Sequence, residues 1–472
     1  MRELVKNCLD NKHYIHFIGI GGAGMSAIAY VLIKRGYDVS GSDLNAGHMS
    51  AHLAEEGALV YMGHDACQVD GADAVVVSTA IHPENAEYVE AQRRGLPILH
   101  RSDVLAALIN DPNAAGVAVA GAHGKTTTSA MISCIAAEAG IDPTVVIGGE
   151  VSSLGGNALN GQGQYVIAEA DESDGSFLKF YPKLEVITNI EDDHLDFYGN
   201  EENIYQAFKS FVGNLREGGK AVLCVDNMKL RRLSHEISKD YVTYGMEGSN
   251  ADYEASAVNF GIDGTTYTIL CKGEKLCQVR LIVPGRHNVL NSLGAFVAAT
   301  EMGIPMESIL ASLAKFGGAK RRFETKGKVN GIWVVDDYAH HPTEIAVTLG
   351  AARQTRPNRL IVVFQPHRYS RTQLLYKEFC KCFGKCDELI LTSIYAASEP
   401  PIAGVTAEKL AAGITAATGQ EVKCFPYLSN VRDYLVGIVQ KGDLVMTVGA
   451  GDVFKVGEEL VKELEHKNET NN

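Results

Sequence analysis

The segment GAHGKTTT, residues 121–128, brings together glycines, a lysine and threonines between an apolar stretch and a helix-forming one. Backbone N–H groups of such a loop can surround phosphate oxygens, Lys125 can reach the β- and γ-phosphates, and the Thr126 hydroxyl can bind Mg²⁺. The loop is tighter than the standard phosphate loop, because Val119 stands five residues before Gly124 and Gly121 stands three before it. The pattern predicts a nucleoside triphosphate site. A surface turn with an incidental lysine is disfavoured by the position between strand and helix.

A second glycine-rich segment lies near the N-terminus. Gly19, Gly21 and Gly24 form GxGxxG before the helix-like stretch MSAIAYVLIKRG, and Asp43 follows about twenty residues later. Such glycines let the backbone approach a pyrophosphate at a helix start, as in nicotinamide-dependent dehydrogenases. The same physics serves any nucleotide diphosphate, including a UDP-sugar, and a tight turn without a ligand is the remaining interpretation.

Acidic and imidazole side chains follow two strand-like stretches in the middle of the chain. Glu169 comes directly after QYVIA and opens the run EADESD, which holds four carboxylates. His194 follows VITN at a corresponding place. Open α/β sheets bind ligands at these strand ends. Mg²⁺ prefers oxygen ligands, so from the residues alone His194 fits a hydrogen-bonding role as well as a metal-supporting one.

The later part of the chain carries further polar groups at strand ends and at one presumed hinge. Two arginines three residues apart can clamp a carboxylate or phosphate, although each charge taken alone could be a solvated loop residue. The joint occurrence of polar residues at several strand ends and at the hinge favours a site assembled when domains close. The residues concerned are Arg321, Arg322, Asp336, Asp337, Tyr338, His340, His341, His367, Arg368 and Arg371.

The segment GRHNVLN places His287, Asn288 and Asn291 at the start of a predicted helix. An Asn amide offers both a donor and an acceptor, which suits the edge of adenine. Helix capping by Asn is the alternative, and in isolation it is the better supported one.

The elements that position these groups predict an α/β protein of three domains. A Rossmann-like unit covers residues 1–109, a central ATPase domain of the phosphate-loop type covers 110–318, and a C-terminal Rossmann-like domain covers 319–472. Strand-like stretches such as HFI, GVAVA, VITN and LIVVF alternate with helical ones, which indicates largely parallel sheets.

Composition excludes several classes of function. The net charge of −14 argues against a general nucleic-acid partner, and 46% hydrophobic residues are ample for a buried core. The N-terminus has no apolar stretch of signal-peptide length, so we expect a cytoplasmic protein without membrane insertion. Cys380, Cys382 and Cys386 lie on a predicted helix and lack a matching ligand pair, so reduced thiols are favoured over a metal site.

Eight segments in order resemble the Mur ligases, and among them the alanine-adding branch. They are HFIGIGGAGMSAIA, GAHGKTTT, AEADESDGSF, TNIEDDHLDFYG, GRHNVLNSLGA, GAKRRFE, VDDYAHHPTE and FQPHRYSRT, and together they span nearly the whole chain. The GKTTT, EADESD and HNxxN series is typical of the wider family, which includes folylpolyglutamate synthases. GIGGAGMS, DDYAHHPTE and QPHRYSRT favour the alanine-adding branch.

The resemblance implies ATP-dependent ligation of L-alanine to the lactyl carboxylate of UDP-N-acetylmuramate, through an acyl phosphate and a tetrahedral intermediate. ADP and phosphate would be released, in peptidoglycan precursor synthesis. It implies ATP and two Mg²⁺ ions, with Mn²⁺ as a substitute, and a monomer or homodimer. A sister ligase adding a peptide or another amino acid, a nucleotide-sugar dehydrogenase and a non-enzymatic nucleotide-binding regulator are the alternatives.

The resemblance also assigns roles to individual residues. Catalytic roles fall to Lys125, Glu169, His194, Arg322, Asp337 and His340. ATP would be bound by Gly121, Ala122, His123, Gly124, Lys125, Thr126, Thr127, His287, Asn288 and Asn291. The sugar nucleotide and the amino acid would be bound by Gly19, Gly21, Gly22, Ala23, Gly24, Asp43, Ser78, Thr79, Tyr338, His367, Arg368 and Arg371. The metal ligands would be Thr126, Glu169 and His194.

Two positions depart from the pattern of the wider family. Ala122 stands where many members have Thr, a change that a backbone-binding loop tolerates. Lys209 lies fifteen residues after His194, about where several sister ligases carry a carbamylated lysine, but the alanine-adding branch is regarded as lacking it. We therefore expect Lys209 to face solvent on a helix.

Overall fold

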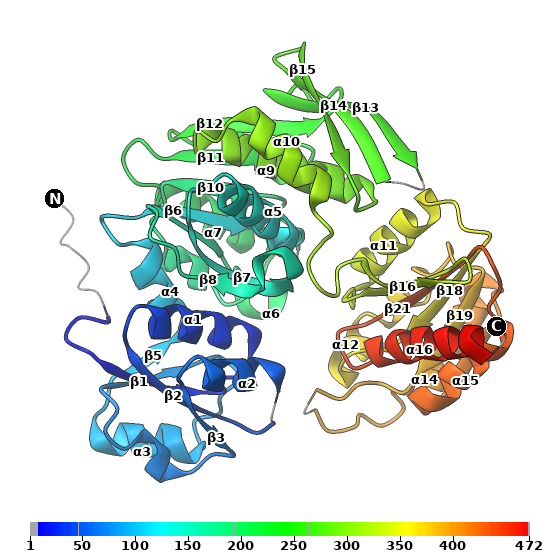
Figure 1. The fold of residues 1–472 in the computed structure, drawn as a ribbon, viewed down its shortest axis with the longest axis horizontal. Coiled ribbons are helices and arrows are strands. Elements are labelled where there is room, and N and C mark those ends of the chain that lie inside the picture. Colours follow the sequence, from blue (N-terminus) through cyan, green and yellow to red (C-terminus); the bar gives the residue numbers. More distant parts are fainter. Residues whose placement is uncertain (1–7, 46, 193, 262–263, 398, 471–472) are drawn as a thin grey trace. The chain divides into compact units, whose positions relative to one another are not determined.

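The computed structural model describes residues 8–45, 47–192, 194–261, 264–397 and 399–470. Within them the chain forms three β-sheets with helices packed on their faces (Figure 1). The predicted fold class, three α/β domains with largely parallel sheets, is confirmed. The domain boundaries drawn from the sequence stay a prediction.

The N-terminal sheet has the strand order β3-β2-β1-β4-β5, and all its pairings are parallel. The strand order reverses direction at β1, which lies between β2 and β4. The loops after the neighbouring strands β1 and β4 therefore begin at the same edge of the sheet, which is where open α/β sheets bind ligands. The strands are β1 (Tyr14–Ile18), β2 (Asp38–Asp43), β3 (Leu59–Met62), β4 (Ala74–Val77) and β5 (Ile98–His100). The helices are α1 (Ala23–Lys34), α2 (His48–Glu55), α3 (Ala86–Arg94) and α4 (Arg101–Ile109), with a 3₁₀ turn η1 (Ala66–Val69).

The central sheet has ten strands in the order β15-β14-β13-β12-β11-β10-β6-β9-β7-β8. Strand β6 lies between β10 and β9 and is parallel to both, so the segments after these three strands lie side by side at one edge. The strands are β6 (Ala115–Ala120), β7 (Thr144–Val151), β8 (Gly156–Leu159), β9 (Tyr165–Glu169), β10 (Leu184–Ile187), β11 (Lys220–Cys224), β12 (Asp240–Met246), β13 (Tyr253–Gly261), β14 (Gly264–Cys271) and β15 (Glu274–Leu281). The helices are α5 (Lys125–Glu138), α6 (Leu195–Tyr198), α7 (Glu201–Gly213), α8 (Met228–Ser234), α9 (Arg286–Glu301) and α10 (Met306–Lys315), with 3₁₀ turns η2 (Ser152–Leu154) and η3 (Ser176–Lys179).

The C-terminal sheet has the order β16-β17-β21-β18-β19-β20, with an antiparallel edge strand β16 and parallel pairings elsewhere. Two apolar clusters cover its two faces, one reaching α11, α13 and α14 and the other α15 and α16. The strands are β16 (Glu324–Val329), β17 (Ile332–Asp337), β18 (Arg359–Phe364), β19 (Glu388–Thr392), β20 (Val422–Phe425) and β21 (Asp443–Val448). The helices are α11 (Pro342–Gln354), α12 (Tyr369–Leu374), α13 (Tyr376–Phe379), α14 (Ala407–Thr418), α15 (Leu428–Ile438) and α16 (Phe454–Thr470).

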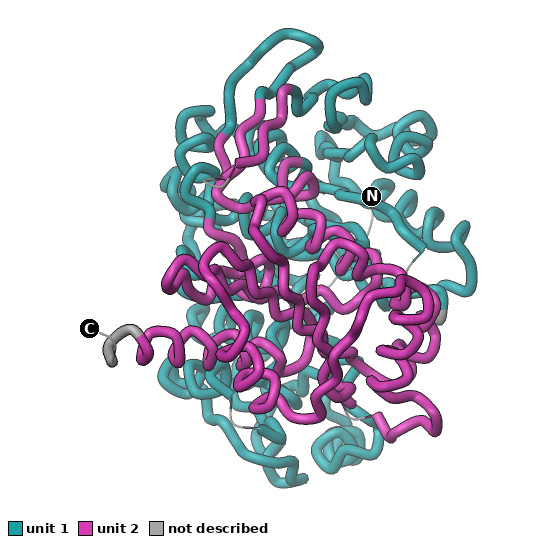
Figure 2. The backbone as a smooth tube through the Cα atoms, turned by 90° about the vertical axis from the view of Figure 1, so that its right-hand side faces the viewer, with its two compact units in different colours: residues 1–256, 268–279, 290–316 teal, residues 257–267, 280–289, 317–472 magenta. Residues whose placement is uncertain are grey.

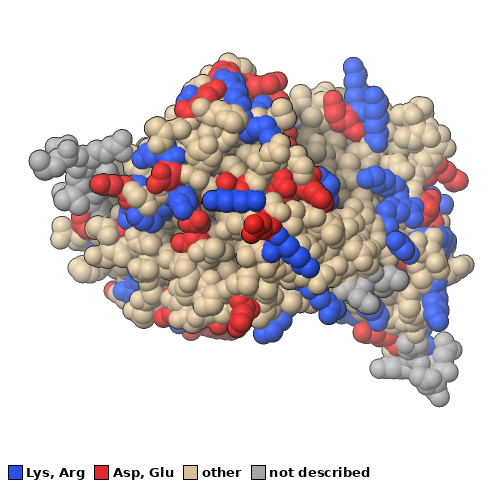
Figure 3. Space-filling view, turned by 90° about the horizontal axis from the view of Figure 1, so that it is seen from above, with Lys and Arg blue, Asp and Glu red and all other residues tan. Residues whose placement is uncertain are grey.

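The chain divides into two compact units, coloured separately in Figure 2. Unit 1 comprises residues 1–256, 268–279 and 290–316, and unit 2 comprises 257–267, 280–289 and 317–472. Unit 1 therefore contains the whole N-terminal sheet together with most of the central one. Acidic and basic side chains are interspersed on the face shown in Figure 3. None of the helices in the described part of the chain is long and apolar enough to cross a membrane.

One local prediction is wrong. Cys380, Cys382 and Cys386 do not lie on a helix, because α13 ends at Phe379 and the chain continues in turns that place Phe379 and Phe383 in the core. All three are free thiols, and burial raises the pKa of each. Among the described residues no group of three or more His, Cys, Asp or Glu has the arrangement of a metal site.

Candidate active site

The N-terminal glycine loop connects β1 to α1. The N–H groups of Gly19 and Ile20 donate to the Ser42 carbonyl at 2.8 and 3.0 Å, and the Gly21 N–H donates to Asp43 Oδ2 at 2.9 Å. A Cβ on Gly21 would lie 2.9 Å from the same oxygen, so a larger residue here would displace the Asp43 carboxylate. Asp43 thus holds the loop itself, a contact that the motif alone did not predict. The helix cap is Gly22, which has no side chain to offer the first-turn amides of α1, so these remain suited to an anion.

Two segments of the central domain fix this loop. Helix α1 packs on β7 and β8. Asn157 of β8, which is buried, donates its Nδ2–H to the Ala23 carbonyl at 2.7 Å. Because Ala23 begins α1, this bond ties the first turn of the helix to the central sheet.

The phosphate loop connects β6 to α5. Gly121 and Gly124 have φ of +135° and +85°, a backbone region that favours glycine. Lys125 donates from Nζ to the Gly121 carbonyl at 2.6 Å and to Glu172 Oε1 at 2.8 Å. Asn291 lies against the loop, since a Cβ on Gly124 would be 2.5 Å from its Oδ1. Lys125 is therefore held between the loop backbone and Glu172 at the start of α5.

Glu169 lies at the end of β9 beside this loop. Its carboxylate accepts from the Thr126 hydroxyl at 3.1 Å and from the Gly148 N–H at 2.7 Å, and Ser129 Oγ lies 3.3 Å away. A hydroxyl beside a carboxylate is the oxygen donor set that Mg²⁺ prefers. Thr126 and Glu169 thus fit a magnesium ion that phosphate oxygens would complete.

Glu172 is a buried carboxyl that sequence reasoning missed. It pairs with Lys125, and its second oxygen, Oε2, has no partner among the described residues. Burial raises the pKa of Glu172 and outweighs the lowering effect of Lys125. His194 Nε2 lies 3.9 Å from Glu172 Oε1, and His194 caps α6 with φ of +58°. The sequence signal was present in the EADESD run, but spacing could not tell which of four carboxylates turns inward.

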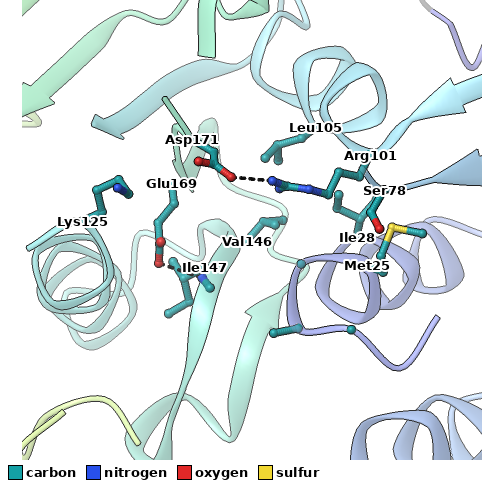
Figure 4. A pocket seen from close by; sticks show the side chains of 14 residues that line it. Met25, Ile28, Ser78, Arg101, Leu105, Lys125, Val146, Ile147, Glu169 and Asp171 are labelled. Carbon is teal, nitrogen blue, oxygen red and sulfur yellow. Dashed lines mark hydrogen bonds and ion pairs between the residues drawn. The ribbon is translucent and has the colours of Figure 1, made fainter. Parts of the chain in front are cut away.

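A cavity of about 350 Å³ connects the two loops within unit 1 (Figure 4). Lys125 and Glu169 lie on one side, Met25 and Ile28 of α1 on the other, and Arg101 pairs with Asp171 between them at 2.5 Å. Burial alone would raise the pKa of Asp171, but Ser173 and the charges of Arg101 and Lys125 lower it. The lining residues are Gly22, Ala23, Gly24, Met25, Ile28, Ser78, Arg101, Leu105, Lys125, Val146, Ile147, Gly148, Glu169 and Asp171.

Several predicted residues meet in this cavity and others lie outside its lining. Gly22, Ala23, Gly24, Ser78, Lys125 and Glu169 line it. Thr79 is exposed after β4, and Thr127 lies in the first turn of α5. Arg101, Asp171 and the apolar wall were missed, because they become neighbours only when α4, β7 and the segment after β9 pack together.

His287 and Asn288 begin α9, as predicted. Asn288 donates its Nδ2–H to the Pro284 carbonyl at 2.7 Å, which ties the first turn of α9 to the segment before it but is not the accepting contact of a helix cap. Burial and the charge of Arg322 lower the pKa of His287 to about 4. His287 and Asn291 are one helical turn apart, so both project from the same side of α9.

Unit 2 contains a second cluster of arginine, tyrosine and histidine side chains, each of which contacts the next. The Arg322 guanidinium lies 5.4 Å from the Tyr338 ring centroid, and the Tyr338 ring meets His340 at 5.4 Å. His340 meets His367 at 6.0 Å, and His367 Nδ1 lies 3.2 Å from Arg371 Nη1. Burial, Arg371, His340 and Arg368 lower the pKa of His367 to about 4, so the ring is neutral near pH 7. These residues form a cluster that combines arginine cations with neutral imidazoles.

Three predicted residues of unit 2 have additional partners outside this cluster. Asp337 is buried, and its carboxyl accepts the N–H groups of Phe323 and Ala339 at 2.8 and 2.9 Å. Burial raises the pKa of Asp337 to about 6. Arg321 pairs with Asp336 at 3.0 Å and donates to the Gly449 carbonyl at 2.6 Å, which makes it a structural cation. Arg368 is half exposed, 3.9 Å from Glu399.

Lys209 lies on α7, as expected, and its Nζ donates to Glu236 Oε2 at 2.7 Å. Asn200 caps the same helix by accepting the Asn203 N–H. The lysine is thus engaged with a neighbouring acidic residue on the protein surface.

Comparison with known proteins identifies the family. Three family models match, described as Mur ligase family, catalytic domain (residues 14–112), Mur ligase middle domain (119–299) and Mur ligase, glutamate ligase domain (321–451). This chain belongs to the Mur ligase family. The Mur ligase is 49% identical to the UDP-N-acetylmuramate–L-alanine ligase of Desulforamulus reducens, over 96% of this chain and 98% of that protein. The enzyme of the same name from Syntrophus aciditrophicus is also 49% identical, over 96% and 93%.

Solved structures of this Mur ligase's relatives agree. The UDP-N-acetylmuramate–alanine ligase of Thermotoga maritima superimposes with a TM-score of 0.84 at 29% identity, covering 96% of this chain and 99% of that one. A murein peptide ligase of Psychrobacter arcticus gives 0.71 at 25% identity, covering 96% and 98%. The three-domain architecture is therefore shared over the full length of both relatives.

Proposed function

We propose that this Mur ligase joins L-alanine to the lactyl carboxylate of UDP-N-acetylmuramate at the expense of ATP, in peptidoglycan precursor synthesis. The relatives named above carry this activity in their names. The observation that carries the proposal is the cavity whose walls include both the start of α1 and Lys125 with Glu169. A sugar nucleotide held at α1 would direct its carboxylate toward a triphosphate held at α5.

The sugar nucleotide would occupy the N-terminal side of this cavity. Its diphosphate would meet the first-turn amides of α1, because helix N-termini favour anions. Arg101 lies on the path from there to Glu169 and offers a cation to the carboxylate. Met25, Ile28 and Leu105 would exclude water around it.

The first chemical step would be attack of that carboxylate on the γ-phosphate of ATP, which forms an acyl phosphate and breaks the bond to the β-phosphate, so that ADP leaves. Charge spreads over the phosphoryl oxygens in the transition state, and Lys125 with the loop amides would stabilise it. Thr126 and Glu169 would hold Mg²⁺, and His194 with Glu172 would support a second ion. When bound, the metal neutralises phosphate charge and aligns the reacting oxygens. Mn²⁺ fits the same oxygen donors.

The second step would be attack by the amine of alanine on the acyl phosphate. Unit 2 supplies the groups suited to the amino acid, with Arg371 and Arg368 for its carboxylate and Tyr338 beside it. The ammonium form of alanine must lose a proton first. Burial lowers the pKa of both His340 and His367, which keeps both rings neutral near pH 7 but makes them weaker bases, so they are suited to accept a hydrogen bond from the incoming amine rather than to take its proton.

The alternative substrates differ in the size of the incoming amine. A murein peptide ligase is among the structural relatives, at 25% identity. The identity of nearly half to alanine-adding enzymes supports the single amino acid over a peptide. The phosphate loop and the family argue against a dehydrogenase, which has no use for a triphosphate site.

Phosphate release from ATP and Mg²⁺ tests the proposal. Purified protein would be given UDP-N-acetylmuramate and each of the twenty amino acids, with single omissions. We expect release that needs both the sugar nucleotide and L-alanine and that disappears in Lys125→Met. Lys275→Met is the matched control, because Lys275 is exposed on β15. Release with a peptide but with no single amino acid would refute the alanine assignment.

A further inference from the structure

The segment after β19 pairs with the segment that carries the arginines of unit 2. The Tyr395 N–H donates to the Pro366 carbonyl at 2.8 Å, and the Arg368 N–H donates to the Tyr395 carbonyl at 2.8 Å. These two bonds pair His367 with Tyr395 as an isolated parallel bridge outside the sheet. Tyr395 thus joins the two segments through both its N–H and its carbonyl.

The Tyr395 side chain adds a second contact. Its ring stacks on His367 with centroids 5.5 Å apart and planes 10° from parallel. Gly451 leaves room for it, since a Cβ there would lie 2.7 Å from Tyr395 Cγ. The stack is made by the ring face and the bridge by the backbone, so neither contact needs the hydroxyl. His367 is held between Tyr395 on one side and Arg371 and His340 on others.

Arg368 shows why such support is needed. Its backbone has φ of +70° and ψ of 139°, a conformation that residues other than glycine adopt only when their surroundings enforce it. The Tyr395 carbonyl holds its N–H, and Glu399 accepts from the Ser370 N–H at 3.0 Å and the Ser370 hydroxyl at 2.6 Å. Strained backbone of this kind is found where a side chain must be aimed.

We propose that Tyr395 is a positioning residue that fixes His367 and Arg368 in the orientation in which they receive the amino-acid substrate. The proposal rests on the function proposed above for the unit 2 cluster. Tyr395 makes no chemical step. It acts by restricting rotation of the His367 ring and by holding the strained backbone at Arg368. Less conformational entropy is therefore lost when the amino acid binds.

The kinetic test compares Tyr395→Leu, which removes the ring, with Tyr395→Phe, which keeps it. We expect Tyr395→Leu to raise the KM for L-alanine by roughly 10- to 100-fold while the KM for ATP changes by less than about threefold. Tyr395→Phe should recover most of the lost affinity for L-alanine. Tyr427→Ala is the matched control, because Tyr427 is 69% exposed in the same unit. An unchanged KM for L-alanine in Tyr395→Leu, or an equal rise in the KM of all substrates, would overturn the proposal.

A second test does not depend on turnover. The groups that face His367 are Tyr395, Arg371, Arg368, His340 and Glu399. Burial is the main reason for its pKa of about 4. In Tyr395→Leu, water should reach the ring and the pKa of His367, followed by NMR of the Cε1 proton, should rise by roughly one unit. Tyr395→Phe should titrate as the wild type does.

The two tests separate failure of the positioning role from failure of the proposed function. If wild-type protein uses an amino acid other than alanine, the NMR comparison still applies and the KM comparison moves to that substrate. If His367 titrates identically in wild type and Tyr395→Leu, Tyr395 does not position it, whichever amino acid is used. Equal thermal midpoints of the variants and Tyr427→Ala would show that folding is intact.

Discussion

Replacing Lys125 should affect both stability and nucleotide binding, and the structure allows the two effects to be separated. Lys125 Nζ pairs with Glu172, whose side chain is only 4% exposed. Lys125→Met leaves this carboxylate buried without its cation, which is strongly destabilising for buried pairs. The same change removes the charge that we assign to the phosphates.

The part of the stability loss that comes from the unpaired Glu172 carboxylate has an upper bound. The variant can always escape by protonating Glu172, whose ordinary pKa is 4.5. A pH of 7 lies 2.5 units above that pKa. At about 1.36 kcal/mol per unit, protonating Glu172 at pH 7 therefore costs at most about 3.4 kcal/mol. At pH 5 the bound falls to about 0.7 kcal/mol. The destabilisation of Lys125→Met should therefore shrink as the pH falls from 7 to 5.

Adding Glu172→Gln to Lys125→Met gives a double variant in which the buried charge is removed as well. We expect the double variant to regain the wild-type free energy of unfolding to within about 1 kcal/mol, measured by urea denaturation with circular dichroism. When ATP binding is measured without metal, the double variant should still bind ATP as weakly as Lys125→Met does, whereas Glu172→Gln alone should bind it as the wild type does. Phosphate release by Lys125→Met should fall by roughly 10²–10³-fold.

Comparison of the wild type, Lys125→Met, Glu172→Gln and the double variant tests both roles of Lys125. A double variant that binds ATP as tightly as Glu172→Gln would refute the role of Lys125 at the phosphates. A loss of stability in Lys125→Met that is the same at pH 5 and pH 7 would refute the assignment of that loss to the Glu172 carboxylate.

Three further predictions concern other parts of unit 1. Glu185 is fully buried in β10, and burial raises its pKa well above 4.5, so the folded protein keeps a proton that the unfolded chain releases as the pH rises. Glu185→Gln should therefore stabilise the protein more at pH 8 than at pH 5, and equal urea midpoints for variant and wild type at both would contradict this. Asn157→Ala should raise the KM for UDP-N-acetylmuramate about fivefold through loss of one buried hydrogen bond to Ala23, with the KM for L-alanine unchanged as the check. His194→Ala should raise the Mg²⁺ concentration needed for half-maximal phosphate release while ATP binding without metal stays constant, and an unaltered magnesium titration would exclude His194 from metal support.

Much of the fold follows from local patterns. Strand-like stretches rich in apolar residues predicted β1, β6, β9, β10 and β18. Strands β13–β15 were not predicted, although their side chains alternate between buried and exposed and Asp263-Gly264 and Lys272-Gly273 are turn signals between them. The turn at Cys380 was missed because burial of Phe379 and Phe383 in the core, not local propensity, ends the helix there.

The sequence by itself determined which residue types stand at the strand ends, and hence a phosphate loop, a second glycine loop, and a family. Loop chemistry is local, since it depends on residues within a few positions of one another. Only the tertiary structure decided how these groups are used. It turned Asp43 onto the Gly21 amide and buried Glu172 against Lys125. It also placed Arg101 beside Asp171 and stacked Tyr395 on His367. Each of these contacts joins residues 22 or more positions apart, and their spacing along the chain carries no record of it.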